Sequence, residues 1–162
     1  NGVSKGRQKR AKFQYRFVWT NVVYQAGEIK AATWKKGKPW AEETVKTTGA
    51  VAQMTLEPEV KSIVSDGEDL AYVTVVVRDA EGRVVPRMRT RVRLSVEGPG
   101  ELVASQNGDE ADFEDFRSPN RHVFNGYLSV ILRGKPGTEG TMVLKVESDG
   151  LPTAHAEIKV QR

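Results

Sequence analysis

The densest group of side chains able to do chemistry is an acidic loop in the second half of the chain. Its members are Asp109, Glu110, Asp112, Glu114 and Asp115. Carboxylate oxygens are the ligands that Ca²⁺ prefers, so Asp109, Asp112 and Asp115 are candidate ligands for this ion. Their spacing does not match a known calcium-binding loop. The alternative is a solvated loop anchored by Phe113 and Phe116.

Four arginines alternate along the segment that precedes this loop. They are Arg87, Arg89, Arg91 and Arg93. Residues two apart share one face of a strand, so a continuous strand would place all four guanidinium groups on the same side. Such a face could contact a partner, which would be the acidic loop, another domain or an anionic glycan. The alternative is a solvated face or a strand edge protected by charge.

Aromatic residues concentrate in the first third of the chain. They include Tyr15, Trp19, Tyr24, Trp34 and Trp40. Flat aromatic rings can stack on the C–H groups of sugars, and Trp40, next to a proline in a turn, is with Trp34 a candidate carbohydrate-binding residue. For Tyr15 and Trp19, alternation along the sequence favours burial in a core instead.

Other kinds of site have little support. A basic run (Lys5, Arg7, Lys9, Arg10 and Lys12) lies near the aromatic residues, but no recognition motif accompanies it, so we expect no nucleic-acid partner. The chain has no cysteine and two histidines, His122 and His155, both on expected strands. We therefore expect no cofactor and no histidine-based metal centre.

Composition and charge suggest two units. The chain has 162 residues, of which 38% are hydrophobic and 28% charged, and it is too short for a complete (β/α)₈ barrel of about 250 residues. It has no apolar run long enough to span a membrane. Residues 1–53 carry 11 lysines and arginines against 3 glutamates, whereas residues 54–162 carry 14 against 18 acidic residues. This break predicts units at 1–53 and 54–162, joined by a short linker at 47–53.

Period-two alternation and turn residues predict strands in both units. In the first unit we expect three strands, over 12–19, 28–34 and 40–47. In the second unit we expect seven or eight short strands, within the segments 54–57, 62–64, 71–78, 84–85, 91–97, 101–104, 121–124, 127–132, 141–148 and 154–161. Within 71–78, alternation directs Ala71, Val73, Val75 and Val77 inward.

These strands define the expected fold class, which is all-β with two consecutive immunoglobulin-like β-sandwich units. Three strands in roughly 50 residues bury too little surface for an independent core. We therefore interpret residues 1–53 as a partial sandwich truncated at its N-terminus. Strand edges left exposed by missing strands would favour pairing into a dimer.

The order of the motifs resembles one family, the bacterial glycoside hydrolase family 2 enzymes of the β-galactosidase type. Residues 13–53 resemble the domain after the catalytic barrel, through the segments 17–19, 26–38 and 47–50. Residues 54–162 resemble the C-terminal immunoglobulin-like domain, through the segments 66–86, 95–100, 107–109 and 124–132. The family often has the loop GDPTSxEPF, whereas residues 108–116 here read GDEADFEDF.

The resemblance implies that both catalytic glutamates belong to the barrel, so this fragment would be a non-catalytic accessory region without catalytic residues. Its partners would be the catalytic and neighbouring domains of the same chain, and its parent a secreted or periplasmic bacterial enzyme that hydrolyses O-glycosyl bonds. One alternative is a carbohydrate-binding module that contacts polysaccharide. Another is the stalk of an adhesin with invasin-like repeats, although no second copy of the 54–162 pattern occurs.

Overall fold

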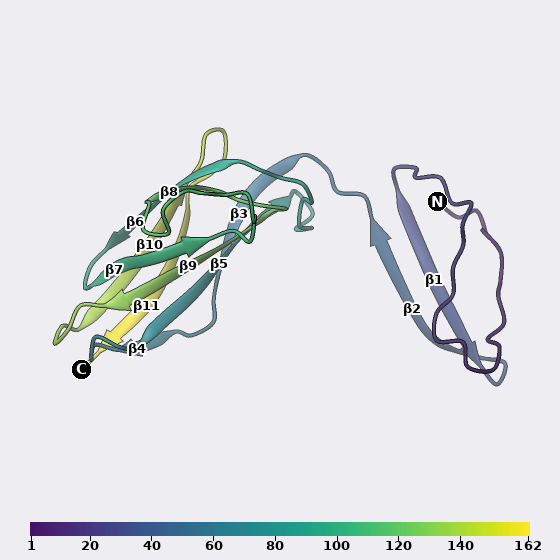
Figure 1. The fold of residues 1–162 in the computed structure, drawn as a ribbon, viewed down its shortest axis with the longest axis horizontal. Coiled ribbons are helices and arrows are strands. Elements are labelled where there is room, and N and C mark those ends of the chain that lie inside the picture. Colours follow the sequence, from purple (N-terminus) through teal and green to yellow (C-terminus); the bar gives the residue numbers. More distant parts are fainter. The chain divides into compact units, whose positions relative to one another are not determined.

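The computed structural model describes residues 1–162 and contains strands but no helix (Figure 1). The chain divides into two compact units, Asn1–Thr47 and Thr48–Arg162. The sequence places the boundary after residue 53. In the structure, residues 48–53 belong to the second unit, whose first strand, β3 (Val51–Pro58), includes the end of the expected linker.

The first unit contains one antiparallel hairpin, formed by β1 (Glu28–Lys35) and β2 (Lys38–Lys46). Its two-residue turn places Lys36 at φ 52° and Gly37 at φ 77°. This left-handed pair is the turn whose twist matches that of the flanking strands. Both strands agree with the sequence prediction, and a β-bulge interrupts their register between Thr33 and Trp34.

The expected strand over residues 12–19 is not formed, so that prediction is wrong. Phe13 has φ 66°, which leaves the extended region. The backbone hydrogen bond in this stretch is local, from Gln14 N to Ala11 O (3.2 Å). A strand needs a neighbour to complete its ladder, and here none pairs with it. Tyr15 and Trp19 are consequently exposed rather than buried.

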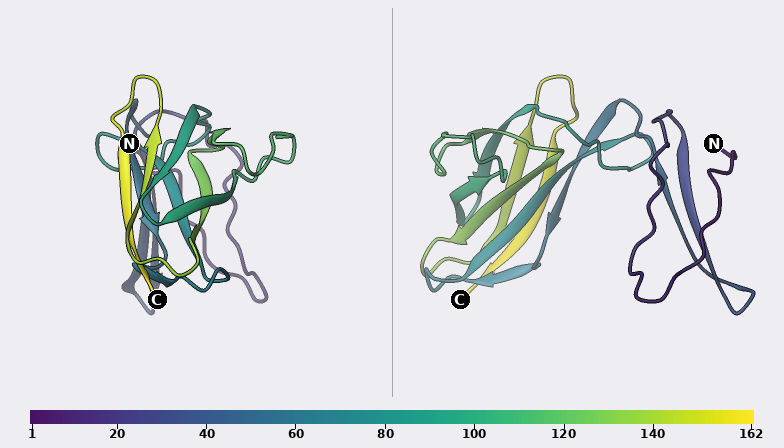
Figure 2. Two further views of the ribbon diagram at one scale, coloured as in Figure 1. Left: turned by 90° about the vertical axis from the view of Figure 1, so that its left-hand side faces the viewer. Right: turned by 45° about the vertical axis from the view of Figure 1, so that its right-hand side comes forward.

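The second unit is a β-sandwich of two sheets (Figure 2). The five-stranded sheet has the order β4 (Ser62–Val64), β11 (Ala154–Gln161), β10 (Gly140–Glu147), β6 (Arg91–Glu97) and β8 (Asn120–His122). The four-stranded sheet has the order β3, β5 (Leu70–Asp79), β9 (Tyr127–Gly134) and β7 (Gly100–Gln106). Neighbouring strands are antiparallel except β4 and β11, which are parallel.

The core lies between these sheets and confirms the inward positions of β5. Ala71, Val73, Val75 and Val77 are fully buried, opposite Leu94, Leu144 and Ile158 of the other sheet. Fully burying one such valine or leucine side chain contributes about 1.5–3 kcal/mol. The sandwich therefore has the continuous core that the first unit lacks, since no residue of 1–47 is buried.

The expected strand at 84–85 is reduced to one bridge, between Val84 and Arg78. The chain there is organised by Asp79, a fully buried residue at the end of β5. Its carboxylate accepts hydrogen bonds from the backbone N–H groups of Gly49 (2.9 Å), Glu81 (3.1 Å) and Arg83 (2.8 Å). The Gly49 bond fixes the start of the second unit and explains why residues 48–53 are not a free linker.

The all-β fold class is confirmed, with a sandwich in the second unit. The structure shows the first unit as a two-stranded sheet joined to irregular chain, not as a sandwich. No segment forms a helix of the length and apolarity needed to cross a bilayer.

Candidate functional site

The arginines selected from the sequence do not share one strand face. Arg87 has φ 63° and lies, with Arg89, before the start of β6. Arg91 and Arg93 do lie on the exposed face of β6, alternating with the buried Val92 and Leu94. A turn rather than a continuous strand precedes Arg91. The predicted alignment of four arginines on one strand face is therefore wrong, because only Arg91 and Arg93 share such a face.

Two of these arginines contact the acidic loop, and this loop is one of the three partners that the sequence allowed for them. Arg89 Nη2 lies 3.0 Å from Asp109 Oδ2, and Arg91 Nη2 lies 3.0 Å from Glu114 Oε1. Both arginines are largely exposed, so each pair contributes at most about 1 kcal/mol. The contacts nevertheless hold Asp109 and Glu114 of the loop against the start of β6.

The centre of the loop is held by Arg121 of β8, whose side chain is 1% exposed. Its Nε donates to Ser105 Oγ (3.1 Å) and its Nη1 to Asp112 Oδ2 (2.9 Å). Its Nη2 donates to the carbonyl oxygens of Glu114 and Asp115, both at 2.7 Å. One guanidinium group thus joins β7, β8 and the loop.

Arg121 is not among the residues expected from the sequence, because charged side chains rarely occupy inward positions. Arg121 is two residues before the fully buried Val123, and residues two apart on a strand share a face. The alternation within 121–124 therefore directs both side chains inward. A charged residue at an inward position next to an acidic loop is the signal that would have found it.

The three candidate metal ligands, Asp109, Asp112 and Asp115, have a shared structural role. Each accepts, through Oδ1, the backbone N–H two residues further on, at 3.0, 3.0 and 2.8 Å. These are Asx turns, so their spacing of three corresponds to successive turns of the loop. No three acidic or histidine side chains come together as a group that could hold a metal ion. The three candidate ligands are therefore not gathered around one point, and calcium binding stays a prediction.

Asp112 accepts more hydrogen bonds than Asp109 or Asp115, with donors at both of its carboxylate oxygens. The backbone N–H of Glu114 lowers the pKa of this carboxyl, and the Asn107 amide and the Arg121 guanidinium lower it further against the opposing effect of burial. Asn107 Nδ2 donates to Asp112 Oδ2 at 2.7 Å. The carboxylate is therefore held ionised as a structural acceptor.

Phe113 and Phe116 do not anchor the loop, which corrects the sequence interpretation. Their exposed fractions are 94% and 62%. The Phe116 ring has Arg121 Cζ 5.5 Å from its centroid, whereas Phe113 projects into solvent. Polar contacts, not the phenylalanines, hold this loop.

Trp34 and Trp40 are both on the hairpin and both exposed, at 50% and 67%. Arg7 Cζ lies 5.1 Å from the Trp34 ring centre, and Lys35 Nζ lies 4.3 Å from that of Trp40. The β-bulge opposite Thr33 and Trp34 leaves Trp40 without a partner in the register. Each tryptophan ring thus has a different cation beside it.

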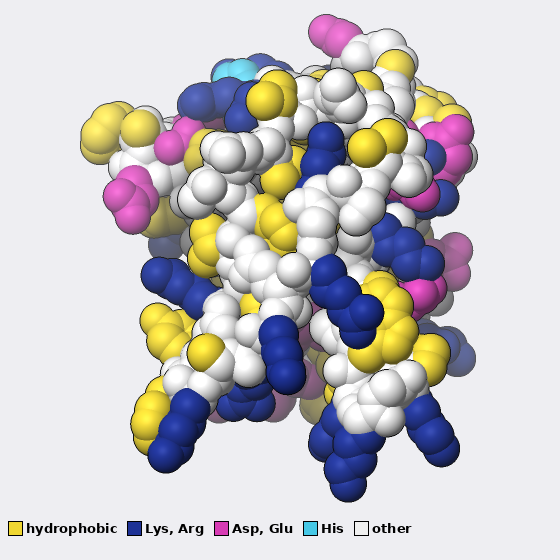
Figure 3. Space-filling view, turned by 90° about the vertical axis from the view of Figure 1, so that its right-hand side faces the viewer, with side chains coloured by type: hydrophobic (Ala, Val, Ile, Leu, Met, Phe, Trp, Pro, Cys, Tyr) yellow, Lys and Arg dark blue, Asp and Glu magenta, His cyan; other side chains and the backbone are white.

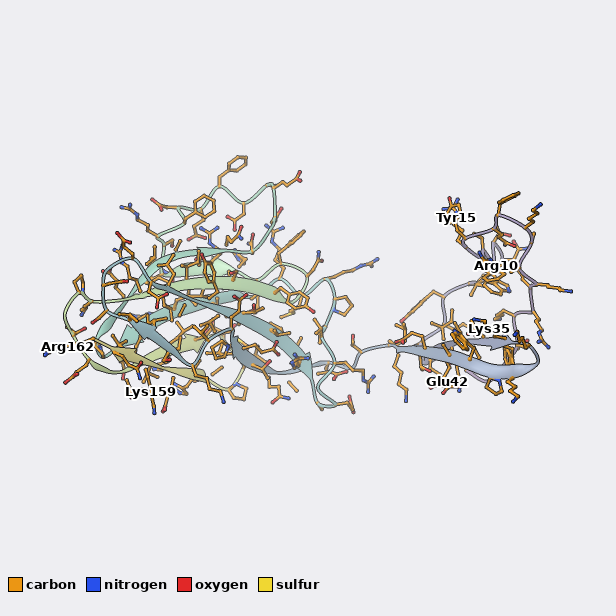
Figure 4. All side chains as sticks on the ribbon, turned by 90° about the horizontal axis from the view of Figure 1, so that it is seen from below. Arg10, Tyr15, Lys35, Glu42, Lys159 and Arg162 are labelled. Atoms are coloured by element: carbon orange, nitrogen blue, oxygen red, sulfur yellow. The ribbon has the colours of Figure 1, made fainter.

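Figure 4 shows Lys35 and Glu42 on the hairpin, and Arg10 and Tyr15 on the irregular segment before it. Within the hairpin, Lys30 Nζ pairs with Glu42 Oε2 at 2.8 Å. In the space-filling view of Figure 3, apolar side chains lie open between projecting lysines and arginines. The large apolar side chains exposed in the first unit are Val3, Phe13, Tyr15, Phe17, Val18, Trp19, Val22, Val23, Tyr24, Ile29, Trp34, Trp40 and Val45.

The surface has two shallow hollows that could take a ligand. One, in the first unit, is lined by Gln8, Phe13, Gln14, Tyr15, Arg16 and Val18. The other, in the second unit, is lined by Glu139, Gly140, Thr141, Lys159, Val160, Gln161 and Arg162. Retaining and inverting glycosidases need two carboxyl groups flanking the sugar. The first hollow has no acidic side chain and the second has only Glu139.

Comparison with known proteins identifies the family. A model described as glycoside hydrolase family 2 C-terminal domain 5 matches residues 54–157. The chain belongs to this family. A second model, described as a domain of unknown function, matches residues 1–41. The family resemblance inferred from the sequence is therefore confirmed.

Individual relatives agree with this glycoside hydrolase family 2 assignment. A β-galactosidase of Bacteroides ovatus is 31% identical over 163 residues, covering 99% of this chain and 19% of that protein. A β-glucuronidase of Formosa agariphila is 35% identical over 89 residues, covering 52% of this chain and 9% of that protein. The chain thus spans about a fifth or less of these relatives.

Solved structures show the same fold. A glycosyl hydrolase family 2 member from Bacteroides cellulosilyticus has a TM-score of 0.83 at 26% identity, covering 87% of this chain and 18% of that one. A β-glycosidase from Bacteroides vulgatus has a TM-score of 0.77 at 24% identity, covering 86% of this chain and 18% of that one. The chain is therefore a C-terminal region of a glycoside hydrolase family 2 protein.

Proposed function

We propose that this region is a non-catalytic accessory part of a larger glycosidase, in which it packs against neighbouring domains. The observation that carries the proposal is the first unit, which exposes many large apolar side chains and buries no residue. Contiguous apolar surface of this kind marks an interaction site. A partner domain would supply the core that a two-stranded sheet cannot form alone.

The electrostatics of the buried carboxyl groups support a structural role. A general acid in a glycosidase needs a raised pKa, so that it is protonated at neutral pH. In the sandwich, the backbone N–H of Glu114, the Asn107 amide and the Arg121 guanidinium lower the pKa of Asp112 against the opposing effect of burial. For Asp79, burial is outweighed by the N–H groups of Gly49, Arg83 and Glu81 and by the Arg83 charge, and its pKa is also lowered. Both carboxyl groups therefore have pKa values shifted in the direction opposite to that of a general acid.

The parent protein, on this proposal, hydrolyses β-linked glycosides, with β-galactosides as the first candidates because of the Bacteroides ovatus relative. Secretion or a periplasmic location is part of the same proposal and rests on the family alone. Family membership also favours an accessory region over an adhesin stalk. Pairing of two copies through exposed strand edges stays a prediction.

The experiment compares the 162-residue chain with the full-length protein that contains it. Chromogenic β-galactoside and β-glucuronide are offered to both at equal concentration. We expect turnover by the full-length protein and none above buffer by the chain. Turnover by the purified chain would refute the non-catalytic assignment. In the full-length protein, deletion of residues 1–47 should lower the thermal midpoint if they pack against other domains, and an unchanged midpoint would refute packing.

Carbohydrate binding is the second candidate, favoured by the exposure of Trp40 and Trp34. Each tryptophan already has a cation near its ring, which a sugar would have to displace. Affinity electrophoresis through gels containing galactan, xyloglucan or glucan tests this function. Retardation that is lost in Trp40→Ala but kept in Tyr72→Ala would establish it, and equal mobility in all gels would remove it.

A further inference from the structure

The acidic loop combines a fixed backbone with an unprotected aromatic tip. Residues 107–118 connect β7 to β8, and Phe113 at their centre is the most exposed large apolar side chain in the protein, at 94%. Phe116 is 62% exposed, and the two are separated by only two residues. Neither is needed to hold the loop, because Arg121 and the Asx turns do so.

The loop is fixed at both flanks and at its centre. Asn107 Nδ2 donates to Asp112 Oδ2 (2.7 Å) and to His122 O (2.8 Å). Ser118 Oγ donates to Asn120 O at 2.8 Å, and Ser105 N donates to Phe116 O at 2.7 Å. A loop held in one conformation before binding loses little entropy when a partner docks, which favours affinity.

Exposed aromatic side chains on such loops are typical of binding hot spots. A hot spot is a large, central side chain that fills a desolvated pocket on the partner. Leaving a phenylalanine in water costs the free energy that its burial would provide, about 1.5–3 kcal/mol. The sandwich gains nothing from Phe113, because that side chain is almost wholly in solvent.

The polar groups of the loop indicate what kind of partner fits. The ion pairs of the loop use Asp109, Asp112 and Glu114. Glu110 and Asp115 are exposed and have no ion pair, so with the single exposed Arg117 the surface beside Phe113 keeps a net negative charge. The Asn107 amide, the Ser118 hydroxyl and the Arg121 guanidinium are engaged within the loop, so the free acceptors beside Phe113 are the carboxylates of Glu110 and Asp115, which pair with lysine or arginine. This chemistry favours a protein partner.

We propose that the Phe113 loop docks into an apolar socket with lysine or arginine at its rim, on the remainder of the same glycoside hydrolase polypeptide. The inference rests on the proposed function. The Bacteroides ovatus relative extends far beyond the matched region, which is 19% of its length, so ample protein surface is available in the same chain. A partner in the same polypeptide is present at a high effective concentration, so one aromatic anchor suffices.

Hydroxyl-radical footprinting with mass spectrometry tests the proposal directly, because it reports the exposure of individual aromatic side chains. We expect Phe113 to be oxidised several-fold more slowly in the full-length protein than in the 162-residue chain. Tyr72, a half-exposed aromatic residue of β5, serves as the internal reference for the radical dose. Equal Phe113 oxidation in both proteins would overturn the proposal. Protection that grows with the concentration of the 162-residue chain would also overturn it, because it would identify a second copy as the partner.

Variants give a second measurement. In the full-length protein, Phe113→Ala should lower the thermal midpoint and Phe113→Leu should restore most of it, because leucine can still fill an apolar socket. In the 162-residue chain, Phe113→Ala should leave the midpoint unchanged, since the ring contacts little there. Equal midpoints for all three full-length proteins would refute docking. These outcomes differ from turnover by the isolated chain, which alone would refute the non-catalytic function.

Discussion

Arg121 and Asp112 form an ion pair, with Nη1 2.9 Å from Oδ2, at the edge of an otherwise apolar core. The arginine also supports three further hydrogen bonds, so it acts as the fixed point of a loop of twelve residues, 107–118. Buried charges are tolerated when they are paired and hydrogen-bonded, and Arg121 uses four of its five N–H donors in such bonds. Arg121 therefore holds the centre of the loop, between flanks that Asn107 and Ser118 fix.

Replacing Arg121 should be the most damaging polar substitution in the sandwich. Arg121→Ala leaves Asp112 and two carbonyl oxygens without their donor, and removing one partner of a buried pair costs about 3–5 kcal/mol. Urea denaturation followed by circular dichroism measures the loss. Arg117→Ala, at an exposed position in the same loop, is the matched control and should change stability by no more than about 0.5 kcal/mol. Similar losses for both variants would contradict the role of Arg121.

The lowered pKa of Asp79 makes the free energy of unfolding depend on pH. A carboxyl whose pKa is lower when folded stabilises the protein above its unfolded pKa of about 3.9, and the stabilisation is lost as the pH falls toward the folded pKa. We expect the thermal midpoint to fall as the pH is lowered below about 4. Asp79→Asn should be less stable at neutral pH and show a shallower acid decline, whereas Asp149→Asn should follow the wild type. A wild-type acid slope in Asp79→Asn would contradict this account.

Calcium should not stabilise the protein. Asp109, Asp112 and Asp115 each use one oxygen in an Asx turn, and Asp112 uses the other with Arg121 and Asn107. Differential scanning calorimetry with millimolar CaCl₂ and with EDTA should give the same midpoint once ionic strength is matched. A calcium-dependent rise that Asp115→Asn abolishes would restore the metal interpretation made from the sequence.

The first unit should open before the second. A two-stranded sheet without buried residues is marginally stable in water, while the sandwich has a continuous core. Brief trypsin digestion of the 162-residue chain should remove residues 1–46 and leave a resistant fragment that begins at Thr47. Hydrogen exchange should be fast in β1 and β2 and slow in β5 and β9. Protection of β1 equal to that of β5 would show that the first unit is stable alone.

The sequence predicted the sandwich strands well because alternation and turns reinforced each other. Residues 62–64, 91–97 and 154–161 are strands with those bounds in the structure. Residues 12–19 show equally clear alternation but form no strand, because alternation indicates a face and not a pairing partner.

The site was harder to predict than the fold. The pairing of Arg89 and Arg91 with the acidic loop was among the alternatives, yet Arg121 was overlooked because a charged residue at an inward position violates the usual pattern. The spacing of Asp109, Asp112 and Asp115 suggested metal ligands, whereas repeated Asx turns need the same residues at the same intervals.

The hydrogen bond from Gly49 N to Asp79 has a mechanical consequence. A pulling force that enters the sandwich through Thr48 reaches this bond, at 2.9 Å, before it reaches the ladder between β3 and β5. Asp79 lies at the end of β5, in the interior of its sheet, so the load passes to a strand with a neighbour on each side. This hydrogen bond thereby resists peeling of the edge strand β3 when tension is applied to the sandwich at its N-terminal end.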